Sequence, residues 1–353
     1  MNKDIIDQFN LLINQIQAEY VDAQTRNDSN ETIKHKYRLQ SLKKAVQVLR
    51  RLDFEIEEAN DVAHMPGIGK GTLARIDEIL KTGQLNEIKK PKKKISDTIT
   101  SIQELKGIFG IGDKKAQTLV TKYNIKSVAE LKQAYNKKKI DLDNNIRLGL
   151  KYYDLLELNI PRDEITKTAK YLTKVAQKID KDLFLMICGS YRRGRKTSGD
   201  IDVLLSHPKI PTQKQIGNPE KYGAKNYINL FVDKLSEDGF LLDHLTDKAS
   251  TKYMGFSKLD SLPVRRIDVR FVPYSGLAAS MLSFTGPRDL NIAMRREAIK
   301  RNMILNEYGL YKEGENGDLT MVKTSTEEEI FNKLGMEYMT PEERDSYEVE
   351  KKR

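Results

Sequence analysis

The chain has 353 residues, of which 39% are hydrophobic, and this is enough for more than one compact core. Lysine and arginine number 61 against 51 aspartates and glutamates, and the formal net charge of +10 favours a polyanionic partner, with nucleic acid fitting best. No apolar segment is long enough for a signal peptide or a membrane span, which predicts a soluble intracellular protein without a membrane partner. The single cysteine, Cys188, excludes intrachain disulfides and a cysteine-based zinc cluster, and its apolar surroundings predict a buried thiol.

The N-terminal part of the chain has the apolar periodicity of helices. One series of apolar residues recurs at helical spacing from Ile5 to Ile16. A second series follows at Ile33, Tyr37, Leu42, Val46 and Leu49. We expect both series to face a core. The basic residues on the other face of the second helix could follow a phosphate backbone or simply lie in solvent, and the sequence supports both interpretations equally.

A glycine motif then occurs twice. Met65-Pro-Gly-Ile-Gly-Lys70 and Ile108-Phe-Gly-Ile-Gly-Asp113 each precede a helical pattern, and each resembles a helix-hairpin-helix element. Glycines in such a turn let backbone N–H groups approach a DNA phosphate, which predicts contacts at Gly67, Gly69, Gly110 and Gly112. Turn carbonyls could hold monovalent Na⁺ or K⁺, at Ala63, Met65 and Ile68 in the first hairpin and at Lys106, Ile108 and Ile111 in the second. The lysine-rich stretch 89–94, broken by proline, predicts a linker.

From about residue 161 onward, strand-like and helix-like patterns alternate, which predicts a mixed α/β unit. The expected elements are a helix over 165–179, a strand over 184–188, a helix near 227–235, and strands near 251–258 and 265–272. After Pro273 we expect a helix over 289–300, hairpin-like stretches within 307–323 and a glutamate-rich C-terminal segment.

The segment from Gly189 to Asp202 carries the clearest chemical signal. An apolar strand ends at Gly189-Ser190, where a glycine turn opening a helix would present N–H groups, a hydroxyl and arginines to a triphosphate. Asp200 and Asp202 would point to the same side of a strand and could bridge two divalent metals. An Asp-x-Asp pair alone is usually a solvated face, but the strand, turn, basic helix start and paired aspartates in this order favour nucleotidyl transfer.

Two aspartates leave such metals short of ligands, so a third carboxylate should exist. Asp268 is the candidate, because it lies in an alternating strand pattern between Arg266 and Arg270 on its own face. Taken alone, this pattern fits a surface strand with charge pairs. Beside the aspartate pair, it favours catalysis.

With these motifs together, the chain resembles the family X DNA polymerases, of the DNA polymerase beta type, over nearly its full length. The resemblance includes both hairpins, the segment from Gly189 to Asp202 with its continuation to Pro208, and the strand around Asp268. It extends through Phe284-Thr285-Gly286, Asn291 and Arg295 to Leu305-Asn306-Glu307-Tyr308. The Gly-Ser to Asp-x-Asp core alone would indicate only the wider nucleotidyltransferase superfamily.

The resemblance implies a DNA-directed DNA polymerase that joins a primer 3′-hydroxyl to a dNTP in short gaps, as in base-excision repair. Asp200 and Asp202 would bind two Mg²⁺ ions, for which Mn²⁺ could substitute, and Asp268 would complete the catalytic metal site. Nucleotide contacts are implied at Gly189, Ser190, Arg193, Gly199, Phe284, Gly286 and Asn291. DNA contacts are implied at His35, Lys36, Lys252, Arg266 and Arg295. Arg270 resembles the family's switch residue, which pairs with an aspartate in the open state and releases it on closing.

The resemblance also implies an α+β, multidomain chain in four parts. Residues 1–90 would form a helical, lyase-like DNA-binding domain with the first hairpin, and residues 91–160 a DNA-binding subdomain with the second. Residues 161–272 would form a nucleotidyltransferase palm with a mixed sheet, and residues 273–353 a small nucleotide-selecting subdomain. The expected partners of this monomeric protein are gapped or nicked DNA and a dNTP. The sequence does not decide between the nucleus and a viral replication site.

Four positions depart from the family pattern. Arg75 stands where relatives carry the lysine that removes a 5′-deoxyribose phosphate through a Schiff base, and arginine cannot supply the neutral amine. Gly71 and Glu87 also replace lysines of that pocket, so we expect weak or absent lyase activity, with Lys70 as the possible substitute. Ser283 replaces an aromatic residue near the nucleotide sugar.

Other functions remain open at this point. Ser283 and Arg288 leave room for an end-joining polymerase or a template-independent terminal transferase. A catalytically silent protein that binds DNA ends would keep the hairpins, but the complete aspartate set argues against it. An RNA nucleotidyltransferase of the wider superfamily would not predict paired DNA-binding hairpins.

Overall fold

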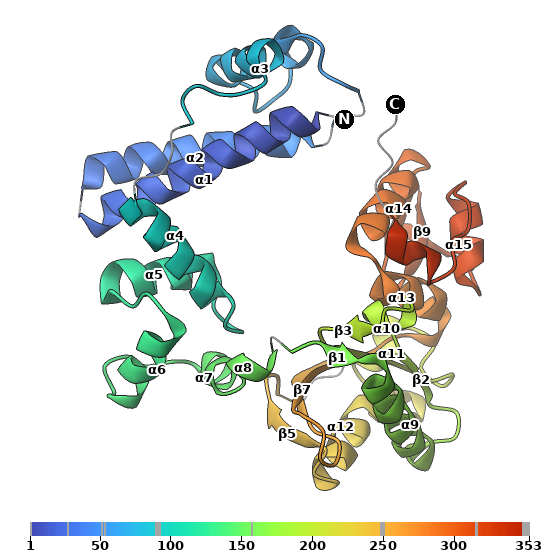
Figure 1. Ribbon diagram of the computed structural model, residues 1–353. Helices are drawn as coiled ribbons and strands as arrows, with labels where there is room; N and C mark the ends of the chain where they lie inside the picture. The colour runs from blue at the N-terminus through green and yellow to red at the C-terminus, as the bar shows by residue number, and fades with distance from the viewer. Residues whose placement is uncertain are drawn as a thin grey trace. The chain divides into compact units, whose positions relative to one another are not determined.

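The computed structural model describes residues 2–26, 28–50, 52, 54–88, 93–156, 158–247, 251–314 and 317–347. The chain divides into two compact units, Met1–Leu150 and Lys151–Glu350, and each is described by itself (Figure 1). Residues 89–92 of the predicted linker lie outside the described residues. Lys93 and Lys94 begin a helix, so the prediction of a linker is wrong for those two residues.

The first unit consists of helices. It contains α1 (Lys3–Thr25), α2 (Ser29–Leu49), the 3-10 turn η1 (Ala59–Val62), α3 (Lys70–Thr82), α4 (Lys93–Lys106), α5 (Asp113–Tyr123), α6 (Val128–Asn136) and α7 (Asn144–Lys151). Helices α1 and α2, drawn in blue in Figure 1, lie side by side, and Asp28 caps α2 by accepting a hydrogen bond from the Glu31 amide. Phe9, Leu12 and Ile16 of α1 pack with the buried face of α2 and with α3 in one core.

The buried face of α2 differs from the predicted one. The buried residues are His35, Leu39, Leu42, Val46 and Leu49, together with Ala45. Ile33 and Tyr37, which we expected in the core, are 54% and 66% exposed. A shift of two residues turns a side chain by about 200° around an α-helix, so the series that begins at residue 35 excludes residues 33 and 37. The prediction that Ile33 and Tyr37 face the core is therefore wrong.

The second unit is built on a five-stranded mixed sheet. Its strand order is β2 (Phe184–Ile187), β4 (Ile201–Ser206), β7 (Arg265–Phe271), β6 (Lys252–Ser257) and β5 (Leu241–His244). Only β4 and β7 run parallel in this series of neighbours. Ile201, Val203 and Leu205 pack on one face with α9 (Arg162–Ile179) and α12 (Tyr227–Glu237). Shorter elements before the sheet and at its margins are α8 (Tyr153–Leu156), β1 (Ile160–Pro161), β3 (Thr197–Ser198), α11 (Gln213–Ile216) and η2 (Pro219–Tyr222).

The opposite face of the sheet meets α13 (Leu277–Thr285), which follows the turn η3 (Tyr274–Gly276). Leu204, Cys188 and Val272 form a small core there with Leu277, Met281 and Phe284. Cys188 is a free, buried cysteine, as predicted, and burial raises the pKa of its thiol to about 12. Because side chains alternate along β4, Asp202 shares this face with Leu204.

The C-terminal part combines helices with a three-stranded antiparallel sheet. Helix α14 (Arg288–Lys300) leads to β8 (Met303–Asn306), β9 (Gly309–Glu313) and β10 (Leu319–Val322), followed by α15 (Glu327–Lys333) and the turn η4 (Glu343–Ser346). Leu290, Met294, Leu310 and Phe331 lie in a core of their own with α13. The predicted fold class, with helices first and an α+β catalytic part after them, is confirmed. None of the described helices is both long and apolar enough to cross a membrane.

Candidate active site and DNA-binding elements

Three aspartates meet on the face of the central sheet that α13 partly covers. Asp202 of β4 stands opposite Asp268 of β7 in the parallel ladder, and Asp200 immediately precedes β4. Ligand oxygens of all three lie within 4.8 Å of one another. The structure thus brings together the three carboxylates that the sequence singled out, although they come from strands 66 positions apart in the chain.

The environment of these carboxylates suits a cation. Burial raises the pKa of Asp202 to about 6, and the charge of Asp268 adds to the increase. Burial likewise raises the pKa of Asp268, whose Oδ1 has no hydrogen-bond partner in the described part of the chain. Arg266 pairs with Asp200 and lies 3.4 Å from Asp268 Oδ1, whereas no ion pair involves the buried Asp202 among the described residues. Oxygen ligands with an excess of negative charge are what hard divalent cations prefer, and the residues fit such ions.

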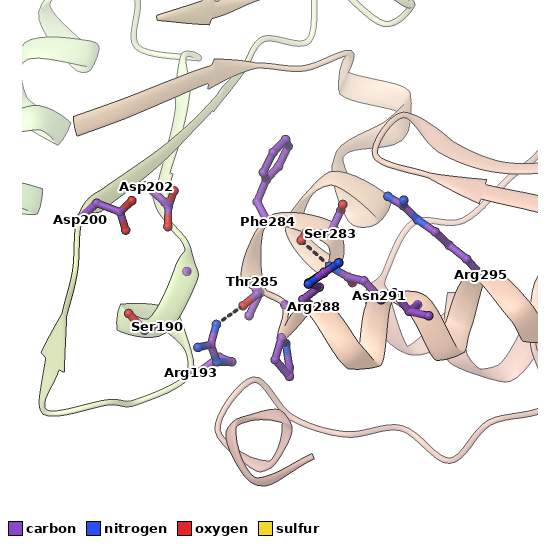
Figure 2. A pocket seen from close by; sticks show the side chains of 14 residues that line it. Ser190, Arg193, Asp200, Asp202, Ser283, Phe284, Thr285, Arg288, Asn291 and Arg295 are labelled. Atoms are coloured by element: carbon purple, nitrogen blue, oxygen red, sulfur yellow. Dashed lines mark hydrogen bonds between the residues drawn. The ribbon is translucent and has the colours of Figure 1, made fainter. Parts of the chain in front are cut away.

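The aspartates open onto a cleft of about 670 Å³. One wall is formed by Gly189, Ser190, Arg193, Asp200 and Asp202, and the other includes Phe284, Gly286, Asn291 and Arg295. Figure 2 shows the two aspartates and Ser190 across the cleft from Phe284 and Asn291. Nine of the residues that the sequence marked for metal, nucleotide or DNA contact therefore line one space. Ser283 and Arg288 line it as well.

The first wall depends on the glycine turn after β2. Gly189 has φ +56° and begins the one-turn helix α10 (Gly189–Arg192). A Cβ at this position would come 2.2 Å from Asp202 Oδ2, so only glycine lets the turn pass this close to the aspartate. Arg193 follows the turn and donates through Nη1 to the Thr285 carbonyl at 2.6 Å. Gly199 does not line the cleft, and a Cβ there would meet nothing within 4 Å.

The second wall is held by backbone contacts. Asn291 on α14 donates through Nδ2 to the Ser283 carbonyl at 2.8 Å, which fixes its side chain beside the cleft. The Gly286–Pro287 peptide bond, between α13 and α14, is cis. Arg295, one turn further along α14, lies 3.9 Å from Glu307 and keeps about half of its side chain exposed.

Three further predicted residues lie on β6 and β7. Lys252 stands opposite Arg270 in the β6–β7 pair, and both are half-buried. The Arg270 guanidinium lies 5.7 Å from the centre of the Phe284 ring, and both residues border a cavity of about 80 Å³ beside Asp202 and Asp268. Arg266, expected to contact DNA, is instead paired with the aspartates in this structure.

Both glycine motifs form the same tight turn. The Ile68 amide donates to the Met65 carbonyl at 3.1 Å, and the Ile111 amide donates to the Ile108 carbonyl at 3.0 Å. Gly67 and Gly110 have φ of +102° and +89°, as the third residue of a type II turn requires. Gly69 and Gly112 are extended and precede α3 and α5 directly, so the amides at both helix starts remain available to an anion. Of the proposed cation ligands, Met65 and Ile108 thus already accept one hydrogen bond each.

The first hairpin domain places His35 differently from our expectation. Its ring is buried in the helical core, with Nε2 2.9 Å from Glu31 and Nδ1 3.5 Å from Glu19. A buried ring paired with carboxylates cannot reach DNA, so we withdraw His35 from the DNA contacts. Lys36 is exposed on α2, as a phosphate contact requires.

A charged network fills the place of the expected lyase centre. Arg75 pairs with Glu87 through Nε and donates through Nη2 to Glu87 Oε2 at 3.1 Å, and Arg38 pairs with the same carboxylate. Burial opposes ionisation of Glu87, but the hydrogen bond and charge of Arg75, aided by Arg38, outweigh it and lower its pKa. Arg75 and Glu87, which both depart from the family pattern, therefore form an ion pair with each other. The sequence did not mark Arg38 for this network, because its partner Glu87 is 49 positions away and no local pattern links the two residues.

Four family descriptions match the chain. They are a helix-hairpin-helix domain over residues 1–85, the fingers domain of DNA polymerase lambda over 103–157, the DNA polymerase beta palm over 159–274, and the DNA polymerase beta thumb over 280–345. The three aspartates and the Gly189 turn fall in the palm segment. The second wall of the cleft falls in the thumb segment.

Named relatives cover most of this chain. It is 29% identical over 323 residues to DNA polymerase lambda of Rattus norvegicus, covering 88% of this chain and 53% of the relative. It is 28% identical over 319 residues to DNA polymerase lambda of Arabidopsis thaliana, covering 85% of this chain and 56% of the relative. DNA nucleotidylexotransferase of Xenopus laevis is 24% identical over 341 residues, covering 90% of this chain and 66% of the relative. The chain thus spans between about half and two thirds of the length of these relatives.

Proposed function

Because this chain belongs to the family X DNA polymerases, we propose that it adds deoxynucleotides to a primer 3′-hydroxyl in short gaps of double-stranded DNA. The observation that carries the proposal is the cleft in which Asp200 and Asp202 face the Gly189 turn, with Asp268 beside them. Metal-binding carboxylates next to a phosphate-binding turn are what attack on an α-phosphate with loss of pyrophosphate requires. We include a repair role of the base-excision type in this proposal, because such repair needs short gaps to be filled.

Asp200, Asp202 and Asp268 are the residues that would hold two Mg²⁺ ions, with Mn²⁺ as a substitute. Bound there, such ions would lower the pKa of the primer hydroxyl and neutralise charge on the leaving phosphates. Asp268 would help accept the hydroxyl proton, which is supported by an Oδ1 that accepts no hydrogen bond from the described residues and lies 3.4 Å from Arg266. Ionised Asp202 requires a pH above its pKa of about 6, which neutral solution provides.

The substrate contacts follow the two walls of the cleft. Ser190 and Arg193 would hold the β and γ phosphates beside the Gly189 turn, and Gly199 would give backbone access nearby. Phe284, Gly286 and Asn291 would bound the sugar and base, and Arg295 would sense the template strand. Arg270 would act as the switch, moving between the Phe284 ring and an aspartate.

The remaining DNA contacts divide between the two units. Lys252 and Arg266 would contact template and primer near the catalytic sheet. Gly67, Gly69, Gly110 and Gly112 would bind backbone phosphates, with Na⁺ or K⁺ held by carbonyls of the same turns. We keep the predicted division into residues 1–90, 91–160, 161–272 and 273–353 and a monomeric protein as parts of this proposal. In the first domain, Arg38 and exposed Tyr37 replace His35 as candidate contacts to a DNA end.

Primer extension on matched DNA substrates tests the proposal. Wild-type protein should insert the templated nucleotide into a one-nucleotide gap, and should do so better there than at a nick or on single-stranded DNA. Asp268→Ala should lose insertion on every substrate, because the metal site loses a ligand. Glu220→Gln, which changes an exposed carboxylate of the same unit, serves as the control that keeps activity. Equal activity of wild type and Asp268→Ala would rule out the assigned site.

One observation favours a second candidate, template-independent terminal transfer. Arg288 is exposed at the edge of the cleft, where its guanidinium could hold an incoming nucleotide without help from a template base. The same substrates separate the two functions. Extension of single-stranded DNA in the absence of any template, reduced by Arg288→Ala, would favour the transferase.

We also propose that lyase activity is weak or absent. Sodium borohydride should trap no covalent complex with DNA bearing a 5′-deoxyribose phosphate, because Arg75 lacks a nucleophilic amine. Arg75→Lys alone should trap poorly, since Glu87 would pair with the new ammonium group and keep it protonated. Arg75→Lys combined with Glu87→Gln should trap better. Trapping by the wild-type protein through Lys70 would contradict the prediction.

A further inference from the structure

The arginine of the proposed triphosphate site is held by a residue near the C-terminal end of the described chain. Arg193 Nε donates to Asp345 Oδ1 at 2.9 Å, and Arg195 Nε lies 2.7 Å from the same oxygen. Resting on the function proposed above, we propose that Asp345 is a positioning residue that fixes Arg193 for the β and γ phosphates of the dNTP. Asp345 lies in η4, 152 positions beyond Arg193.

The hydrogen bonds of Arg193 show which part of its guanidinium is left for a substrate. Asp345 holds Nε, and the Thr285 carbonyl accepts from Nη1 at 2.6 Å. These acceptors come from two different segments, so the plane of the group is set by two anchors. Arg193 lines the cleft whereas Asp345 does not, and Nη2 makes no hydrogen bond to the described residues. A guanidinium oriented in advance binds phosphate without first losing its rotamer freedom.

Charge supports the same interpretation. Arg193 and Arg195 are like charges brought together by one carboxylate. Burial opposes ionisation of Asp345, but its hydrogen bonds with the two arginines outweigh burial and lower its pKa. Without Asp345 the two guanidinium groups would repel each other, and Arg193 would lose the anchor at Nε. A carboxylate bound to two arginines still leaves one net positive charge for the phosphates.

Asp345 is itself held firmly in place. The preceding residue, Arg344, is fully buried and binds Glu327 at 2.8 Å and the Met339 carbonyl at 2.9 Å. The Glu327 carboxylate also accepts hydrogen bonds from Nη1 and Nη2 of Arg192, at 2.8 and 2.6 Å. The end of α10 is thus joined to the C-terminal part twice, through Arg192 and Glu327 and through Arg193 and Asp345. Asp345 therefore connects the nucleotide-selecting part of the chain to the triphosphate end of the cleft.

Steady-state insertion into gapped DNA tests the role. Asp345→Ala should raise KM for the dNTP about tenfold, because a loose arginine must be ordered on binding, while kcat stays within about threefold. Affinity for gapped DNA should not change. Asp345→Glu, which keeps the charge, should recover part of the loss. Glu343→Ala is the control, because it removes a contact of the same turn to the Thr340 amide without touching Arg193.

Binding of inorganic tripolyphosphate, measured by calorimetry without DNA, separates this proposal from the proposed polymerase activity. Wild type should bind it, and Asp345→Ala should bind about tenfold more weakly. If wild type binds tripolyphosphate but extends no primer, the polymerase proposal fails. The affinities of wild type and Asp345→Ala for tripolyphosphate still test the role of Asp345. A lower KM in Asp345→Ala, an unchanged KM, or no tripolyphosphate binding by wild type would overturn the role. Asp345→Asn replaces the alanine variant if thermal melting shows that the latter does not fold.

Discussion

Asp202→Asn is expected to abolish nucleotide insertion and, in the absence of metal ions, to make the protein more stable at neutral pH. The loss of activity should be at least about 1,000-fold, equivalent to about 4 kcal/mol of transition-state stabilisation, because the substitution removes a shared metal ligand. The gain in stability has a different cause. Burial and the neighbouring Asp268 raise the pKa of Asp202 to about 6 from an ordinary value of 3.8.

The sign of the pH dependence follows from that increase. A carboxyl group whose pKa is higher in the folded state is costly to ionise there, so the cost is absent below about pH 4, grows up to about pH 6 and is complete above it. The difference corresponds to about 3 kcal/mol at neutral pH, as an order of magnitude. Asparagine avoids this cost. Asp202→Asn should therefore match wild type in stability at about pH 4 and exceed it at about pH 7.

Urea denaturation at several pH values, with and without Mg²⁺, measures both effects. Added Mg²⁺ should raise the free energy of unfolding of wild type, because it binds the folded state, and should do little for Asp202→Asn. The exposed Glu220, changed to glutamine, gives the control for loss of a carboxylate elsewhere in the unit. A variant that is less stable than wild type at pH 7 would show that Asp202 is held by contacts that outweigh its burial.

Glu164→Ala is expected to cause a large loss of stability in the second unit. Glu164 and Arg265 form a two-point ion pair at 2.7 and 2.9 Å, with both side chains only 8% exposed. Arg265 Nη1 also donates to the Leu158 carbonyl at 3.0 Å. Removing Glu164 leaves a buried guanidinium without its counter-charge, which costs about 3–5 kcal/mol and lowers Tm by about 10 °C.

The paired replacement separates the cost of a lone charge from the value of the pair. Glu164→Leu combined with Arg265→Met should recover most of the loss, since apolar residues of similar volume often replace a buried ion pair at little cost. Lys234→Ala, which breaks an exposed pair with Asp238, should change Tm little. Calorimetry of all variants provides the test. A loss in the double variant as large as in Glu164→Ala would mean that the site needs charge for folding.

Local sequence patterns were enough to predict the three-aspartate site, because strand geometry positions these residues. Alternation along β4 and β7 places Asp202 and Asp268 on one face, and the parallel register sets them side by side. The two glycine turns were also readable, since a type II turn needs glycine at its third position. In these cases the local sequence contains the physical requirement itself.

Other features depend on partners that no local pattern reveals. Tyr37 looked like a core residue from its spacing, yet a two-residue change of register put His35 in the core instead. Arg75 and Glu87 each appeared as a departure from the family, but only the fold shows that they pair. Asp345 lay in an acidic tail without any motif. Charged residues carry little positional information in sequence, because their partners are chosen by tertiary structure.

The fit between Gly189 and Asp202 constrains how this protein can diverge. Any side chain at position 189 would displace the Asp202 carboxylate, and the positive φ of Gly189 disfavours such a residue even when space is made. The triphosphate turn and the metal site therefore cannot be altered one at a time at this contact. In a library randomised at both positions, functional clones should retain glycine and aspartate together, while neighbouring loop positions accept many residues.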